Sequence, residues 1–243
     1  MAQTAKTQPS RLTPSPKALQ KALEQSARQA QRLADAFGVA VPTVKPRTAN
    51  SPRKTEGQQH CPPFTQPTDI LHFWFEALTD KQHFAKDTAL DAKMRERFGP
   101  TLDAAARCEL FAWRDSPEGR LAEILVLDQF SRNIFRDTPR SFAQDALALV
   151  LAQELVALGQ DQHLPPEQRV FAYMPYMHSE SLPIHAQAVL LFTQLGIEEN
   201  LNFELRHKAI IKRFGRYPHR NAILGRTSSA QELAFLSEPG SSF

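Results

Sequence analysis

One predicted helix carries polar residues on the face where its core residues lie. It spans 117–136 (PEGRLAEILVLDQFSRNIFR), and its first half is apolar on nearly every side. At about 100° per residue, the polar residues of its second half fall in one sector of about 140° that includes Leu121 and Leu125. These polar residues are Asp128, Gln129, Arg132, Asn133 and Arg136. Because isolated charges are too costly to bury, this face must hold ion pairs or line a cavity.

Two interpretations of this face stay open. In the first, Asp128 and Arg132 pair with each other at i and i+4, and the two amides cap a neighbouring helix. In the second, the face lines a ligand pocket, since structural ion pairs and binding sites perturb charges alike. The sector holds two cations for one anion, and Arg136 favours the pocket because a second guanidinium requires an anionic partner.

A second polar region is strongly basic. Residues 206–226 hold seven Lys or Arg and two His, and no acid lies between Glu204 and Glu232. The apolar stripe of this helix predicts that His207 points inward, while Lys208 and Lys212 form a solvated face. Functional side chains often lie on loops that rigid helices hold. We expect anion binding where the helix ends and the loop begins, by Arg213, Arg216, His219, Arg220, Asn221 and Arg226, with His207 beside them.

The third region, 173–180 (YMPYMHSE), places a histidine beside an acid. Pro175 is expected to stop or kink its helix just before His178 and Glu180. Neighbours in sequence do not face one another on a helix, so His-Ser-Glu is not a catalytic triad. His178 or His219 is the candidate acid–base group, with Glu180 to orient it.

The sequence indicates neither a metal nor a cofactor. A metal set of His178, Glu180, His207 and His219 is conceivable, but no two of them have ligand spacing on one helix. The motifs H-E-x-x-H, G-x-S-x-G, the P-loop and paired C-x-x-C are absent from the sequence. The residues therefore point to a site without naming a reaction.

The elements that must position these residues are all helical. From residue 69 onward, apolar residues recur at three and four, and no alternating run predicts a strand. Gly99, Gly159 and Gly196 are expected to end helices, and Ser228 with Gln231 forms a capping box. Short connections predict antiparallel helix pairs. Helices are expected at 69–78, 87–98, 100–113, 117–136, 139–158, 166–178, 181–195, 199–214 and 228–236.

The N-terminal residues 1–66 differ from the rest. They carry 10 basic and 3 acidic residues, against 19 and 23 in 67–243. One amphipathic helix is predicted at about 16–37, loosely attached, followed by a flexible linker. Cys61 and Cys108 form no disulfide framework, which favours the cytoplasm. No stretch has the roughly 20 apolar residues of a membrane span, so no membrane partner is expected.

Six segments of 67–243 resemble, in order, one bacterial family, the domain of unknown function 924. The resemblance implies a right-handed, tetratricopeptide-like array of antiparallel helix pairs, which agrees with the predicted helices. The family pattern has proline where this chain has Ser131. The matching segments are ILHFWF at 70–75, RFGP at 97–100, LDQFSRNIFR at 127–136, AQDALAL at 143–149, YMPYMHSE at 173–180 and RFGRYPHRNAILGR at 213–226.

These observations favour an Arg- and His-lined pocket for an anionic small molecule or an acidic chain end. If the protein is an enzyme, it is a hydrolase or group transferase on a phosphorylated or carboxylated substrate. A peptide-binding or protein-binding scaffold without chemistry is the alternative hypothesis. RNA binding is the third, because Phe214 and Tyr217 lie among the basic residues and can stack on bases.

Overall fold

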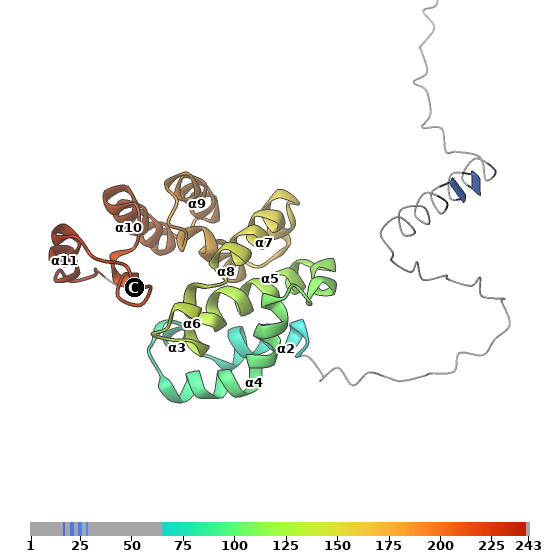
Figure 1. Cartoon of the computed structure of the whole chain (residues 1–243), viewed down its shortest axis with the longest axis horizontal. Coiled ribbons are helices and arrows are strands. Elements are labelled where there is room, and N and C mark those ends of the chain that lie inside the picture. Colours follow the sequence, from blue (N-terminus) through green and yellow to red (C-terminus); the bar gives the residue numbers. More distant parts are fainter. Residues whose placement is uncertain (1–16, 18–19, 22–23, 26–27, 29–64, 242–243) are drawn as a thin grey trace, which may run out of the picture. The chain divides into compact units, whose positions relative to one another are not determined.

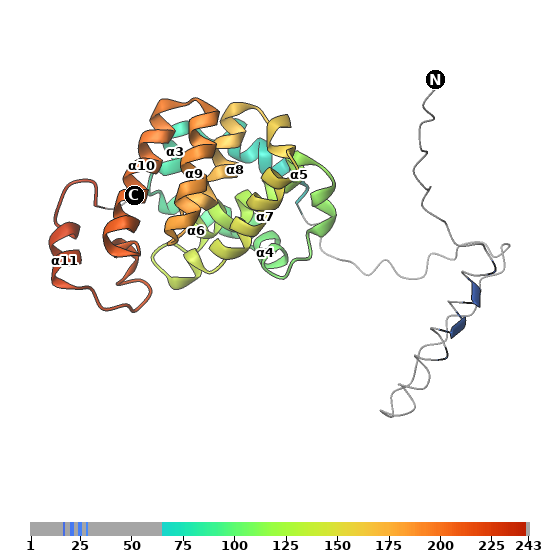
Figure 2. The same ribbon diagram turned by 90° about the horizontal axis from the view of Figure 1, so that it is seen from above.

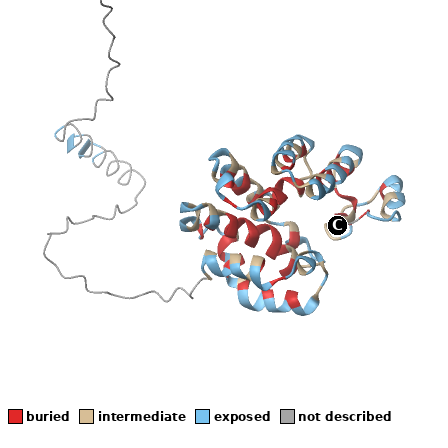
Figure 3. Ribbon diagram, turned by 180° about the vertical axis from the view of Figure 1, so that it is seen from behind, coloured by how far each residue is buried: buried red, intermediate tan, exposed pale blue. Residues whose placement is uncertain are grey.

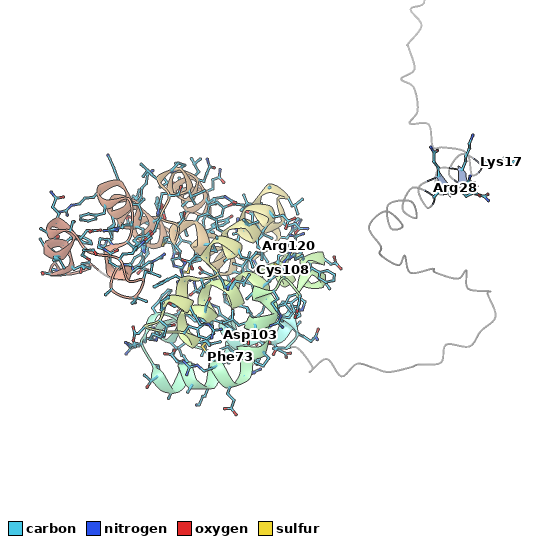
Figure 4. All side chains as sticks on the ribbon, viewed as in Figure 1. Lys17, Arg28, Phe73, Asp103, Cys108 and Arg120 are labelled. Carbon is cyan, nitrogen blue, oxygen red and sulfur yellow. The ribbon has the colours of Figure 1, made fainter. Side chains whose placement is uncertain are left out.

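The computed structural model describes residues 17, 20–21, 24–25, 28 and 65–241. The chain divides into two compact units, Met1–Gln58 and Gln59–Phe243. The described residues of the first unit, including Lys17 and Arg28, are helical and exposed (Figure 4). The end of that helix and the predicted linker lie outside the described residues.

Residues 65–241 form an all-α unit without a strand (Figures 1 and 2), as predicted. Tetratricopeptide-like stacking stays a prediction. No helix in this described part is long and apolar enough to cross a membrane. The α-helices are α2 (Pro67–His72), α3 (Asp80–Phe84), α4 (Thr88–Ala106), α5 (Pro117–Leu125), α6 (Ser131–Ile134), α7 (Asp145–Ala157), α8 (Pro166–Met177), α9 (Leu182–Leu195), α10 (Glu198–Phe214) and α11 (Ala230–Leu236).

The core is built around α5. This helix packs against α2, α7 and α8, and every residue from 121 to 130 is buried (Figure 3). Burial of a continuous run on all sides matches its apolar sequence. On the other side of α8, the helices α9 and α10 follow side by side (Figure 2). The centre of the unit therefore supplies the helix that carries the polar face.

The expected break at Gly99 is wrong, because α4 continues through Gly99 and Pro100. Proline lacks the N–H that would bond back to the preceding turn. The side chains of Met94, Phe98 and Leu102 are nonetheless buried at 0–2% exposure on both sides of it. Packing of these residues keeps both halves of α4 against the core, so tertiary contacts override the local signal.

The helix expected at 100–113 ends at Ala106, and the one expected at 139–158 begins at Asp145, after a 3-10 turn at Pro139–Phe142. Two glycine-terminated helix ends agree with the sequence. Gly159 and Gly196 have φ of 66° and 79° at helix ends, which confirms both as left-handed caps. The last capping box lies one residue later than predicted, at Ser229 and Glu232. The Ser229 N–H donates to the Glu232 carboxylate at 2.7 Å. The predicted partner, Gln231, does not take this role.

Gly119 in α5 allows close contact with the preceding turn. A Cβ at this position would lie 1.9 Å from the Trp113 carbonyl oxygen. We expect Gly119→Ala to lower the free energy of unfolding by about 1–3 kcal/mol, as overpacking does. At Gly99 a Cβ meets nothing within 4 Å, so Gly99→Ala is the matched helical control and should change stability by less than about 1 kcal/mol. Urea denaturation of both variants measures the difference, and equal effects would contradict the steric argument.

Candidate functional site

A π-helical turn joins α5 to α6 and carries the first site residues. It spans Val126–Phe130, and all five of its residues are buried. A π-turn holds more residues than an α-turn, so residues after it are rotated from the positions that 100° steps predict. In addition, α6 ends at Ile134, and Arg136 lies beyond the helix. The predicted single sector is therefore divided in two: Asp128 and Arg132 have one set of partners, and Arg136 has another.

Asp128 is the buried centre of the first set, with 1% of its surface exposed. Its Oδ1 lies 2.8 Å from Nδ1 of His178 and 3.0 Å from Nη1 of Arg132. Its Oδ2 accepts a hydrogen bond from the Gln129 amide at 2.6 Å. The i, i+4 pair expected between Asp128 and Arg132 is thus formed, and the same carboxylate also holds His178, 50 residues further along the chain.

Asp145, at the start of α7, joins two guanidinium groups. Nη2 of Arg132 lies 3.0 Å from its Oδ1, and Nη1 of Arg220 lies 3.1 Å from its Oδ2. The Arg220 guanidinium is also 4.6 Å from the ring centroids of both Phe142 and Tyr217. Two cations are therefore held in fixed orientation around one carboxylate by ion pairing and ring contacts.

Four further hydrogen bonds connect the 178–181 turn to the loop after α10. Glu180 accepts two bonds from Arg226, at 2.6 and 2.9 Å, and one from the backbone N–H of Tyr217 at 2.8 Å. Arg220 donates from Nη2 to the His178 carbonyl at 3.0 Å. Burial works to raise the pKa of Glu180, but the bonds from Arg226 and Tyr217 outweigh it and lower that pKa. These bonds fix the loop against the histidine.

Three buried side chains, Tyr217, His185 and Glu204, are linked to one another and to the backbone on both sides of His178. The Tyr217 hydroxyl donates to the Met177 carbonyl at 2.5 Å and lies 3.2 Å from Nε2 of His185. That Nε2 is 2.9 Å from the Ser179 carbonyl, and Nδ1 is 2.8 Å from Oε1 of Glu204. Because Nε2 donates to Ser179, another proton must lie between His185 and Glu204. Burial raises the pKa of Glu204, which favours its keeping that proton.

The pKa values make the site histidines neutral at pH 7. Burial and the charge of Arg132 lower the pKa of His178. Burial lowers the pKa of His207 to about 3 and that of His219 to about 4. Burial also works to raise the pKa of Asp128, but Arg132 and His178 together outweigh it and lower that pKa. His178 therefore donates from Nδ1 to an ionised Asp128, and its Nε2 holds a lone pair that can accept a proton.

Three residues of the predicted anion site have other partners in the structure. Arg216 donates to Glu232 on α11 from Nε at 2.7 Å and from Nη2 at 2.8 Å. The Asn221 amide lies 3.3 Å from Oε1 of Glu232. Arg213 is exposed, with its guanidinium 4.6 Å from the Phe214 ring centroid. The contacts of Arg216 and Asn221 join the loop to α11, and none of the three residues contacts His178 here.

The structure gives His178 a different acid from the one expected. We expected Glu180 to orient His178 or His219; Asp128 holds His178 instead, and Arg226 holds Glu180. The reason is geometric, since neighbours along the chain point in different directions. An orienting role of Glu180 toward His219 stays a prediction. Pro175 does not stop α8, which runs on to Met177.

Asn133 and Arg136 belong to a separate group. Arg136 donates to Asp91 on α4 from Nε at 2.6 Å and from Nη2 at 2.9 Å, and the Asn133 amide donates to the same carboxylate at 3.0 Å. These three residues line a cavity of about 240 Å³. Another cavity, of about 520 Å³, lies over the first turns of α10 and includes none of the predicted site residues. The His178 group lines neither cavity, and its access to solvent is through partly exposed side chains.

Sequence reasoning missed the acids that complete both groups. Asp145 lies in the AQDALAL segment at 143–149, which the family resemblance includes. Helical spacing alone does not distinguish it from any other acid in the first turn of a helix. Asp91 has no comparable signal. Within 65–241, no three His, Cys, Asp or Glu side chains lie together in a way that could hold a metal ion.

The comparisons with known proteins agree on a family without an assigned function. The family described as "Bacterial protein of unknown function (DUF924)" matches residues 70–240. A solved structure, that of the protein of unknown function ATU0120 from Agrobacterium tumefaciens, is similar with a TM-score of 0.67 and 40% identity, covering 70% of this chain and 96% of that one. No curated protein matches the chain. Together, the match over 70–240 and the shared helical fold show that the chain belongs to the DUF924 family.

Proposed function

We propose that the group around His178 binds an anionic small molecule or the acidic end of a chain. One observation carries this proposal: Arg132 and Arg220 lie close enough to share the carboxylate of Asp145, at 3.0 and 3.1 Å. Two fixed guanidinium groups that accommodate one carboxylate have the geometry that oxyanions require. The Arg132, Asp145 and His178 side chains are 16–20% exposed, so a ligand can reach them.

The same geometry supports acid–base chemistry on such a ligand. Asp128 holds His178 through Nδ1, and the Nε2 lone pair can take a proton from water as its oxygen attacks a phosphoryl or carbonyl group. Arg132 and Arg220 would balance the charge that develops on the attacked group. As the bond to the leaving oxygen breaks, the protonated Nε2 gives its proton to that oxygen and returns to the neutral form. This corresponds to hydrolysis of a phosphorylated or carboxylated substrate, or to group transfer when an alcohol replaces the water. The free, exposed thiol of Cys108 suits the cytoplasmic location that we propose.

A thermal-shift titration tests the binding. Phosphate monoesters and dicarboxylates are titrated at constant ionic strength against the wild type and Arg220→Lys. We expect a saturable rise in the melting temperature of the wild type and affinity at least about tenfold weaker in Arg220→Lys, because lysine keeps the charge but loses the fork. Arg213→Lys, at an exposed cation of the same region, is the matched control and should bind like the wild type.

Three outcomes separate the alternatives. If no compound stabilises the wild type, or if Arg220→Lys and Arg213→Lys bind alike, the anion site is refuted. A scaffold instead predicts peptide binding that survives His178→Asn, whereas an enzyme should keep its ligand and lose turnover by about 100-fold or more in that variant. Asparagine retains a donor near the Nδ1 position but has no Nε2. RNA binding instead predicts an affinity for RNA that falls steeply as salt is added and when Arg213 is replaced by a neutral residue.

A further inference from the structure

We propose that the cavity between α4 and the end of α6 is a second oxyanion site. It would bind a small molecule through a phosphate or carboxylate group. Its charged lining residues are Lys86, Arg95 and Arg136, with Asp91 and Asp137 as the acids. Three cations against two anions give the cavity a net positive charge, whereas Arg132 and Arg220 at the His178 site face Asp128 and Asp145 in equal number. This site does not depend on the proposed function of His178.

The size of the cavity restricts the ligand. A volume of about 240 Å³ is below the roughly 300–1,000 Å³ of pockets that take drug-sized molecules. Thr88 and Asn133 add polar groups to the lining. A small phosphate or carboxylate compound fits this volume and this chemistry, and a large apolar ligand does not.

Two guanidinium groups are held in place before any ligand arrives. Arg136 uses Nε and Nη2 to bind Asp91, which is buried and also accepts the Asn133 amide. Arg95 uses its own Nε and Nη2 to donate to the Ile134 carbonyl. In both residues, Nη1 takes no part in these bonds and remains to donate to an oxyanion. Because the forks are already fixed, little side-chain entropy is lost on binding.

The rim supplies a third cation that is easily released. Nζ of Lys86 lies 2.6 Å from the Asp137 carboxylate, and the two side chains are 61% and 66% exposed. Exposed pairs of this kind contribute little to stability, so an oxyanion can take Lys86 from Asp137 at small cost. Asp137 also has φ of 60°, a left-handed conformation that is unusual for a residue other than glycine and is often found at ligand sites.

Side-chain NMR of the full chain tests the site directly. Nε–H signals of ¹⁵N-labelled arginine are followed while inorganic phosphate or succinate replaces chloride at constant ionic strength. We expect the Arg95 and Arg136 signals to move saturably with at least one of the two anions. Arg95→Gln should weaken that binding at least about tenfold. Lys93→Gln removes the same charge from another exposed position on α4, and it should bind like the wild type.

Three results would refute the second site. If the Arg95 and Arg136 signals move without saturation, or if Arg95→Gln and Lys93→Gln weaken binding equally, only general surface charge is involved and the second site is refuted. If the anions move the Arg132 and Arg220 signals alone, the second site fails while the proposed function of the His178 group stands. If the anions move the Arg95 and Arg136 signals alone, the second site holds. The His178 site is then tested by the thermal-shift titration described above.

Discussion

Replacing Asp128 by alanine is expected to lower the free energy of unfolding by about 3–5 kcal/mol, the range for breaking a buried ion pair. The carboxylate is 1% exposed and is the common partner of Arg132, His178 and Gln129. Alanine removes this carboxylate from all three residues, and Asp145 is then the one carboxylate among the described residues that pairs with Arg132. Urea denaturation, followed by circular dichroism, measures the loss.

A surface carboxylate provides the control for this prediction. Asp103 on α4 (Figure 4) lies 3.6 Å from Arg140, and both side chains are more than half exposed. Asp103→Ala should therefore cost less than about 1 kcal/mol. Asp128→Asn keeps the shape and one acceptor oxygen, and we expect an intermediate loss. Should Asp128→Ala cost no more than Asp103→Ala, the carboxylate would not be the centre that its contacts indicate.

Lowering the pH from 7.5 to 5.5 is expected to cost about 3 kcal/mol of stability through two histidines. In the unfolded chain a histidine takes up a proton below its ordinary pKa of about 6.5. In the folded chain His207 and His219 stay neutral until about pH 3 and 4, because burial lowers both pKa values. The unfolded state thus binds more protons below pH 6.5, and each histidine costs about 1.4 kcal/mol at pH 5.5. Urea denaturation at the two pH values measures this difference.

A single substitution assigns the effect. His207 lies on α10 with its Nδ1 2.8 Å from the Phe203 carbonyl, and His207→Asn keeps a donor there but cannot titrate. We expect this variant to lose about 1.4 kcal/mol less than the wild type over the same pH range. His163→Gln, at an exposed histidine, should follow the wild type. If His207→Asn and the wild type lose stability equally, the protonation of His207 does not contribute.

The helical fold follows from local signals, and the site follows from them only in part. Periodicity and capping predicted the helices because both act within a few residues. The pair of Asp128 and Arg132 was predictable for the same reason, since it needs only i, i+4 spacing. The contact between Asp128 and His178 spans 50 residues, and no local pattern specifies which acid a distant histidine will meet.

Arg136 shows why spacing alone was insufficient. Its position on the predicted face assumed a regular helix through residue 136, but the π-turn rotates the residues after it, and the helix ends at Ile134. Its partner Asp91 comes from α4, whose continuation through Pro100 was also unexpected. Both differences come from tertiary packing, which overrides weak local preferences when the flanking side chains are buried.

The wide turn at Val126–Phe130 also restricts how the length of the chain can vary. Deleting or adding one residue there would rotate everything after it by about 100° about the helix axis. A change of length after Asp128 would take Arg132 away from Asp128 and Asn133 away from Asp91, so both polar groups would be lost in a single step. A point substitution in this turn changes the contacts of one side chain, whereas an insertion or deletion shifts every residue that follows it. The two sites therefore depend on the number of residues between Leu125 and Ser131 as much as on the types of those residues.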